Sequence, residues 1–104
     1  MEEIIYIGTE AKLNISVEPM EGAVMDNYDF ECEFYCLPNR RLVFGKEQLI
    51  RVDENNYIAV IDTKPLGVGM LKCKVTAYLP DADCEDGVRT EVILIDTGYR
   101  IANA

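Results

Sequence analysis

An alternation of apolar and polar residues in the stretch 69–79 constrains the fold of this chain more than any other feature. Every second residue from Leu71 to Leu79 is apolar, whereas most of the residues between them are polar. Because successive side chains of a β-strand point to opposite faces of a sheet, this period of two predicts a strand with one buried face. Pro80 ends the strand, since proline has no N–H to give to a neighbouring strand. A second β-rich run, 88–95, follows the next turn, so the two runs are predicted to form an antiparallel hairpin.

Short β-rich runs separated by turn residues fill the rest of the chain. The run 12–17 alternates cleanly, and 28–37 places apolar residues at even positions and acids at several odd ones. Turn signals recur every roughly 8–12 residues and no segment resembles a helix, which predicts an all-β, antiparallel, two-sheet immunoglobulin-like sandwich of about six to eight strands. Further strands are expected at 41–44, 49–52 and 57–62, a turn at 38–40, and loops at 18–27 and 63–68. Residues 45–48 are expected to form either one helical turn or a tight connection, and the tight connection is favoured. We expect a single β-sandwich domain over 1–104, with 1–8 as an edge strand or docking arm and 98–104 as a tail.

Charge and missing residue types exclude several classes of function. Of the 104 residues, 19 are acidic and 10 basic, a formal charge of −9, so nucleic acids and anionic lipid surfaces would be repelled. The chain has no histidine, which removes the commonest nucleophile–base pairs and the imidazole metal ligand. No stretch approaches the roughly 20 apolar residues of a membrane helix, and the start, MEEIIYIG, does not resemble a signal peptide. We therefore expect a protein that binds neither nucleic acid nor membrane, and the commonest routes of enzymatic catalysis are closed to it.

Two groups of residues, the acidic turn 81–87 and the four cysteines, are candidate metal sites. The turn 81–87 (DADCEDG) alternates carboxylates, as calcium loops do, but its glycine comes one place late and no bidentate glutamate follows at the required distance. A solvated hairpin turn is favoured instead. The four cysteines lack the paired spacing of zinc sites, and synthesis in a reducing compartment disfavours disulfides, so most of them are predicted to pack in the core. We expect no metal and no cofactor.

Apolar and aromatic residues at the ends of the chain and on polar strand faces are the candidate contact residues. The start of the chain is apolar, the run 88–95 is apolar on both faces, and tyrosines occupy polar faces of two strands. A strand that is apolar on both faces is either covered on both or waits for a partner, and tyrosine buries contact area while keeping its hydroxyl hydrated. The predicted interaction residues are Ile4, Ile5, Tyr6, Ile7, Tyr35, Tyr78, Ile93, Ile95 and Tyr99.

Three phrases of the sequence carry a resemblance to a known family. They are YDFECEFYC (28–36), NNYIAVIDT (55–63) and GVGMLKCKVTAYLPDADCEDGVRTEV (67–92). Over roughly residues 4–97 the chain resembles small β-sandwich virion proteins of phages of gut Bacteroidetes, including the crAss-like group. It is also distantly similar to the N-terminal sandwich domain of phage baseplate upper proteins. The resemblance implies a non-enzymatic structural subunit present in many copies, and it transfers no individual functional residue.

The expected function is that of a virion structural protein, first of all an auxiliary capsid (decoration) protein. Its partners would be other virion proteins, the major capsid protein foremost, in a large symmetric assembly. The protein would be made in the host cytoplasm and reside in the virion. The alternatives are a tail or fibre adaptor and a glycan- or surface-binding module that uses its exposed tyrosines. A hydrolase with paired carboxylates is a third class, but no pair stands out among the acids.

Overall fold

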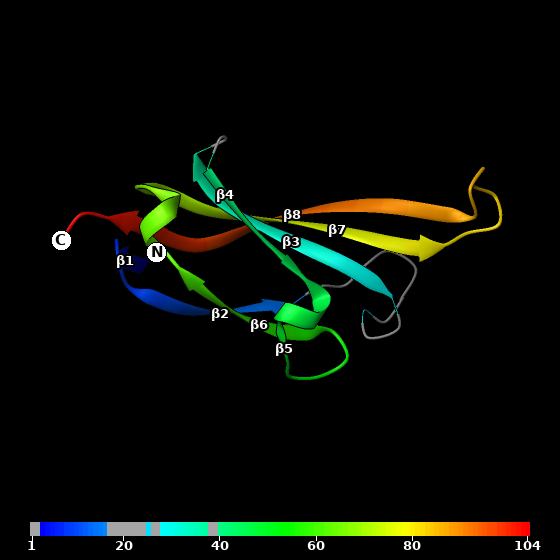
Figure 1. The fold of residues 1–104 in the computed structure, drawn as a ribbon, viewed down its shortest axis with the longest axis horizontal. Helices are drawn as coiled ribbons and strands as arrows, with labels where there is room; N and C mark the ends of the chain where they lie inside the picture. Colours follow the sequence, from blue (N-terminus) through cyan, green and yellow to red (C-terminus); the bar gives the residue numbers. More distant parts are fainter. Residues whose placement is uncertain (1–2, 17–24, 26–27, 38–39) are drawn as a thin grey trace.

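The computed structural model describes residues 3–16, 25, 28–37 and 40–104, and in this part the chain is an immunoglobulin-like sandwich of two β-sheets (Figure 1). One sheet has five strands in the order β1-β8-β7-β3-β4, and the other has three in the order β2-β6-β5. Two single-turn 3-10 helices, η3 and η4, lie between strands. The elements are β1 Glu3–Tyr6, β2 Glu10–Ser16, β3 Asp29–Leu37, β4 Arg40–Gly45, η3 Lys46–Gln48, β5 Ile50–Arg51, β6 Asn56–Asp62, η4 Lys64–Leu66, β7 Gly69–Pro80 and β8 Val88–Ala102.

The predicted hairpin forms the long axis of the molecule. β7 and β8 pair antiparallel from Pro80↔Val88 down to Gly69↔Ile101, and their turn projects beyond the rest of the sandwich (Figure 1). The apolar residues of the predicted alternation, Leu71, Cys73, Val75, Ala77 and Leu79, are all buried. The period of two therefore identified the buried face correctly, because it depends only on the local pleat of the strand.

The core lies between β3 and β7 on one side and β2 and β6 on the other. The even-numbered residues of β3 point into it, as the sequence predicts, and the ring of Phe30 meets that of Tyr57 from the other sheet edge to face at 5.0 Å. Met25 falls within the segment 18–27 that was predicted to be a loop; it is fully buried, and the rest of that segment is outside the described residues. Burial of these side chains is the main favourable term that holds the two sheets together.

The C-terminal segment corrects the prediction of a tail at 98–104, because β8 continues to Ala102 and Ile101 is only 1% exposed. A register shift opposite Met70 and Lys72 marks a bulge near Gly98, whose φ of +78° suits glycine. There the Thr97 hydroxyl donates to the Leu71 carbonyl at 2.7 Å and anchors the bulge. The segment Asp96-Thr97-Gly98 thus bends β8 but does not end it.

Residues 1–8 were predicted to form an edge strand or a docking arm, and the structure shows an edge strand at Glu3–Tyr6. β1 lies beside the last residues of β8, and this pair is parallel, an exception to the expected antiparallel pairing. The chain then crosses to β2 in the other sheet through Gly8 and Thr9. Buried Thr63 holds this crossover, because its Oγ1 donates to the Thr9 carbonyl at 2.8 Å and accepts from the Gly8 N–H at 3.0 Å.

Two smaller predictions also change. Residues 45–48 contain the helical turn η3, the less favoured of their two predicted forms, with the Gln48 side chain accepting the Gly45 N–H at 2.8 Å. The strand expected at 49–52 shrinks to the two residues of β5. β5 lies at the margin of the smaller sheet, where few neighbours enforce an extended chain.

Candidate docking surface

The outer edge of β8 is the longest edge of the five-stranded sheet without a neighbouring strand among the described residues. Along one side β8 pairs with β7 over nearly its whole length, but on the other side only its last four residues pair, from Tyr99 to Ala102, with β1. Within the described part of the chain, residues 88–98 have no strand on that side. An open edge of this length offers a row of backbone N–H and C=O groups to another strand.

The side chains of β8 make this edge apolar on both faces. On the outer face Val92 is 54% and Leu94 is 72% exposed. On the inner face the predicted contact residues Ile93 and Ile95 are half-buried and pack against the core. The sequence analysis predicted Ile93 and Ile95 as contact residues, but Val92 and Leu94 are the side chains that are exposed to solvent. The run 88–95 is apolar on both faces, and this pattern could have pointed to them.

A cavity of about 400 Å³ opens beneath this edge, between β8 and β2. Its walls come from both sheets, and its lining mixes apolar side chains with the polar residues of the two strand margins. The cavity therefore marks the side on which the two sheets do not close over each other. The apolar lining residues are Leu13, Ile15, Phe34, Cys73, Ile95 and Tyr99.

The predicted N-terminal contact residues are alternately exposed and half-buried along the chain. Ile4 and Tyr6 are 54% and 53% exposed on the outer side of β1, whereas Ile5 and Ile7 are half-buried against the core. The Ile7 N–H donates to the Ala102 carbonyl at 2.8 Å, which fixes the end of this segment. The start of the chain thus offers two exposed apolar side chains on a docked strand.

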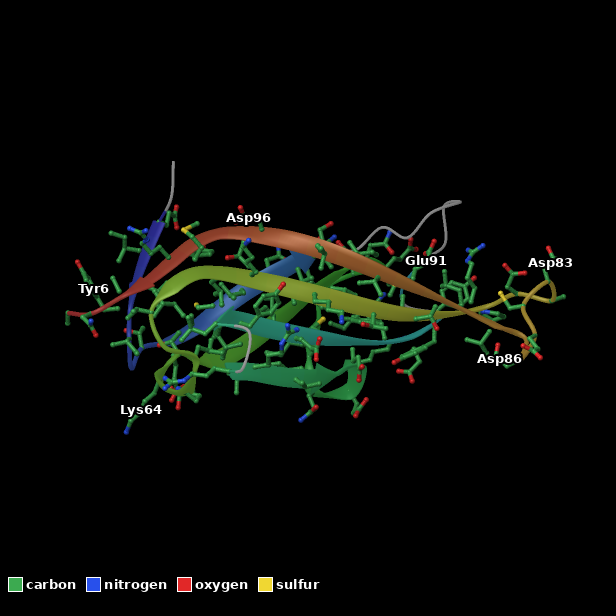
Figure 2. All side chains as sticks on the ribbon, turned by 90° about the horizontal axis from the view of Figure 1, so that it is seen from above. Tyr6, Lys64, Asp83, Asp86, Glu91 and Asp96 are labelled. Atoms are coloured by element: carbon green, nitrogen blue, oxygen red, sulfur yellow. The ribbon has the colours of Figure 1, made fainter. Side chains whose placement is uncertain are left out.

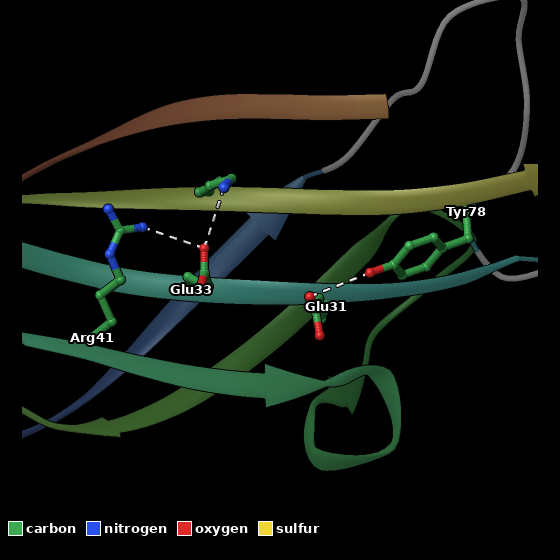
Figure 3. Close-up of polar contacts among 5 residues, drawn as sticks. Glu31, Glu33, Arg41 and Tyr78 are labelled. Atoms are coloured by element: carbon green, nitrogen blue, oxygen red, sulfur yellow. Dashed lines mark hydrogen bonds and ion pairs between the residues drawn. The ribbon is translucent and has the colours of Figure 1, made fainter. Parts of the chain in front are cut away.

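Tyr35 is partly covered on the outer face of the sheet. The Arg41 guanidinium carbon lies 4.2 Å from the centre of its ring. Arg41 also pairs with Glu33 at 3.3 Å, and Lys74 approaches the same carboxylate at 3.7 Å (Figure 3). One face of the Tyr35 ring is therefore already occupied by a cation–π contact, which is worth little at an exposed site but reduces the free aromatic area.

Tyr78 is more open. It is 37% exposed, and its hydroxyl donates to Glu31 Oε1 at 3.4 Å (Figure 3). The negative charge of Glu31 raises the pKa of the Tyr78 phenol, because it disfavours a second negative charge nearby. Tyr35 pairs with Lys72, which lies about six residues from Tyr78 along β7. The two tyrosines are therefore roughly 20 Å apart along the sheet and form no common patch. Tyr99, the last predicted tyrosine, is half-buried and lines the cavity.

The opposite edge of the same sheet, β4, also lacks an outer neighbour among the described strands. Its inward residues Leu42 and Phe44 are partly buried, and the Phe44 ring meets Phe34 edge to face at 5.7 Å. Its outward residue Val43 is 51% exposed. The sequence predicted this strand but assigned it no role.

Carboxylates of the acidic turn 81–87 accept hydrogen bonds and form an ion pair within the same hairpin. Asp81 accepts the Asp83 N–H at 3.0 Å and pairs with Arg89 at 3.1 Å, and Asp86 accepts the Val88 N–H at 3.1 Å. Figure 2 shows Asp83 and Asp86 on opposite sides of the tip of the hairpin. In the part of the chain that the structure describes, no three Asp, Glu or Cys side chains gather as a metal-binding group. The turn is thus stabilised by side-chain to backbone hydrogen bonds, as turn aspartates commonly are.

All four cysteines are free thiols. Cys32 and Cys73 are buried on adjacent strands, and their mutual hydrogen bond, together with burial, raises the pKa of the Cys73 thiol far above its ordinary value. Burial also raises the pKa of Cys36. Because the thiolate is the reactive form, the raised pKa makes Cys36 and Cys73 poor nucleophiles. Cys32 is fully buried, and all three side chains act as packing groups.

The comparisons with known proteins assign no family to this surface. No described helix is long and apolar enough to cross a membrane. No protein-family model, curated protein or solved structure significantly matches the chain.

Proposed function

We propose that this chain is a structural subunit of a bacteriophage virion, an auxiliary capsid protein that docks on neighbouring virion subunits and catalyses no reaction. The observation that carries the proposal is the open, apolar edge of β8. Among the described residues no strand pairs with the outer edge of 88–98, and the side chains of Val92 and Leu94 are exposed there.

This edge favours docking because monomeric proteins usually protect such edges. Charged side chains, prolines or bulges normally blunt a sheet edge, whereas the middle of this one, VILI (92–95), is uncharged. The cavity beneath it can receive apolar side chains of an added strand, whose backbone would pair with β8. Strand addition of this kind gives a small subunit a strong attachment without an active site.

The virion setting is supported by the resemblance of three segments to small phage sandwich proteins. These segments fall on β3, on β6 and on the β7–β8 hairpin, which together make most of the core. The major capsid protein is the proposed partner, in a large symmetric assembly. The protein would be made in the host cytoplasm and carried in the particle.

The direct test is mass spectrometry of purified particles of the phage that encodes the chain. Many copies per particle are expected, and particles without the chain would refute the proposal. Heads and tails analysed separately decide between the capsid role and the alternative of a tail or fibre adaptor.

Binding of the purified chain to particles that lack it tests the docking edge itself. Leu94→Lys should weaken binding strongly, because it places a charge where an added strand would cover the side chain. Val60→Lys is the matched control, since Val60 is 40% exposed on the other sheet. Equal binding by both variants would exclude the β8 edge as the docking surface.

A second candidate is a glycan- or surface-binding module centred on Tyr78. The supporting observation is an exposed aromatic ring beside the Glu31 carboxylate, a pairing that can stack on a sugar and hydrogen-bond its hydroxyls. A glycan array with the wild type, Tyr78→Ala and Tyr35→Ala tests it. Binding that disappears with Tyr78→Ala would support this function over docking on a capsid.

A further inference from the structure

β4 and residues 88–98 of β8, the two edges of the five-stranded sheet that have no neighbouring strand among the described residues, are complementary in direction. β4 is antiparallel to β3, β3 to β7 and β7 to β8, so β4 and β8 run in opposite directions at opposite margins of one sheet. A second copy in the same orientation, placed beside the first, therefore brings its β4 antiparallel to the β8 of its neighbour. Such a contact would extend the sheet with the same pairing it uses internally.

The residue rows of the sheet define the register of this contact. Four consecutive rows run from β8 through β7 and β3 to β4, and their end residues would meet if the next copy continued each row. The rows are Asp96–Lys72–Tyr35–Arg41, Ile95–Cys73–Phe34–Leu42, Leu94–Lys74–Glu33–Val43 and Ile93–Val75–Cys32–Phe44.

On the outer face this register pairs opposite charges and exposed apolar groups. Arg41 of one copy lies opposite Asp96 of the next, which Figure 2 places on β8. Val43, 51% exposed, lies opposite Leu94, 72% exposed. Opposite charges and apolar pairs that face each other across strands are the combinations that stabilise a sheet.

On the inner face the same register pairs only apolar residues. Leu42 would lie opposite Ile95, and Phe44 opposite Ile93; all four are half-buried against the core in the single chain. Their remaining exposed area would be covered in the contact. The same register therefore gives favourable residue pairs on both faces of the sheet.

We propose that copies of this chain join head to tail, with β4 of one copy added antiparallel to β8 of the next, Arg41 opposite Asp96 and Val43 opposite Leu94. The contact is heterologous, so repeated use gives a closed ring or an open filament. The proposal goes beyond docking on the capsid protein, because it names a second copy of the chain as the partner of the β8 edge. At any one β8 edge the two partners exclude each other, since one edge pairs with one added strand.

The contact with Asp96 would add to the contacts that Arg41 makes within its own chain, where it stacks on Tyr35 and pairs with Glu33. Asp96 Oδ1 accepts the Gly98 N–H at 3.0 Å, and a carboxylate accepts several hydrogen bonds. A local pair of opposite charges also offsets part of the repulsion between two chains of charge −9.

A two-fold antiparallel pair of two β8 strands centred on Ile93 is less favourable than this contact, because it would place Glu91 opposite Ile95 and bring no opposite charges face to face. It would also leave Val43 and the whole β4 edge uncovered. The head-to-tail contact covers both edges.

Sedimentation velocity of the purified chain over a wide concentration range, up to millimolar, tests the proposal. The wild type should form species larger than a dimer as concentration rises. Val43→Lys and Leu94→Lys should each remain monomeric, because each blocks one half of the contact. A mixture of the two should form a 1:1 dimer, since the first variant keeps an intact β8 edge and the second an intact β4 edge. Val60→Lys should associate like the wild type, and circular dichroism confirms that each variant is folded.

Three results would overturn the inference. A wild type that is monomeric at every concentration removes self-association. A Val43→Lys variant that still dimerises while Leu94→Lys does not indicates the β8–β8 pair. A monomeric mixture shows that the two edges do not meet. Because only the purified chain is used, these outcomes are independent of whether the chain is found in virions, and absence from virions would refute the proposed function alone.

Discussion

Replacing Ile101 by alanine tests whether the last strand is part of the core. Ile101 is 1% exposed and lies between Gly69 of β7 and Ile5 of β1 in the sheet. The substitution removes three buried carbons, at about 0.8 kcal/mol each by transfer, to which the cavity left behind adds. We therefore expect the free energy of unfolding to fall by about 3 kcal/mol, within the roughly 2–5 kcal/mol range of buried isoleucine-to-alanine changes.

The matched control is Ile4→Ala on the neighbouring strand. Ile4 is paired in the same ladder but is 54% exposed, so the same chemical change should cost less than about 1 kcal/mol. Urea unfolding followed by circular dichroism measures both, with the midpoint shifted and the slope unchanged. Because about 1 kcal/mol corresponds to roughly 4–8 °C in a domain of this size, the melting temperature of Ile101→Ala should drop by more than 10 °C.

Equal losses in the two variants would refute this reasoning. That result would mean that the end of the chain contributes to stability no more than an exposed edge residue does. The sandwich would then be complete without residues 98–102.

Three further outcomes follow from the described contacts. Thr63→Val should lower the free energy of unfolding by about 1–2 kcal/mol, because two hydrogen bonds that hold the N-terminal crossover are lost; thermal melting measures it, and an unchanged stability would contradict it. A thiol reagent should modify Cys32 and Cys73 only as fast as the protein unfolds, since both are buried and the pKa of Cys73 is raised; rapid labelling of all four thiols in the native state would argue against this packing. Hydrogen bonds from the Asn56 side chain and the Asn55 backbone lower the pKa of Asp53 below its usual 3.8. The ionised carboxylate therefore stabilises the folded state above that pH, and this stabilisation is lost as pH falls through the lower pKa of the folded state. The stability difference between the wild type and Asp53→Asn, measured by urea unfolding at several pH values, should therefore shrink with acidification.

Local sequence pattern was enough to predict the buried faces of β3 and β7. Their apolar residues recur with the period of the pleat, and this holds whatever lies beside the strand. Pro80 and the acidic turn after it were likewise readable, because turn chemistry is confined to a few residues.

The docking surface could be predicted only in part. The sequence shows that the run 88–95 is apolar on both faces, yet it does not show which face the second sheet covers. The pairing of Arg41 with Tyr35 and Glu33 is equally invisible in the sequence, because these residues meet through the register of two strands. Tyr35 therefore looked more available for contacts than it is.

The sequence by itself determined that this chain forms a two-sheet β-sandwich around a long hairpin, because strand periodicity and turn residues act over a few positions. Only the tertiary structure decided that residues 98–102 continue β8, that β1 joins it in parallel, and that the edges of β8 and β4 are left open in the described part of the chain. Strand order depends on which distant segments bury the most apolar surface together, and no local pattern encodes that choice.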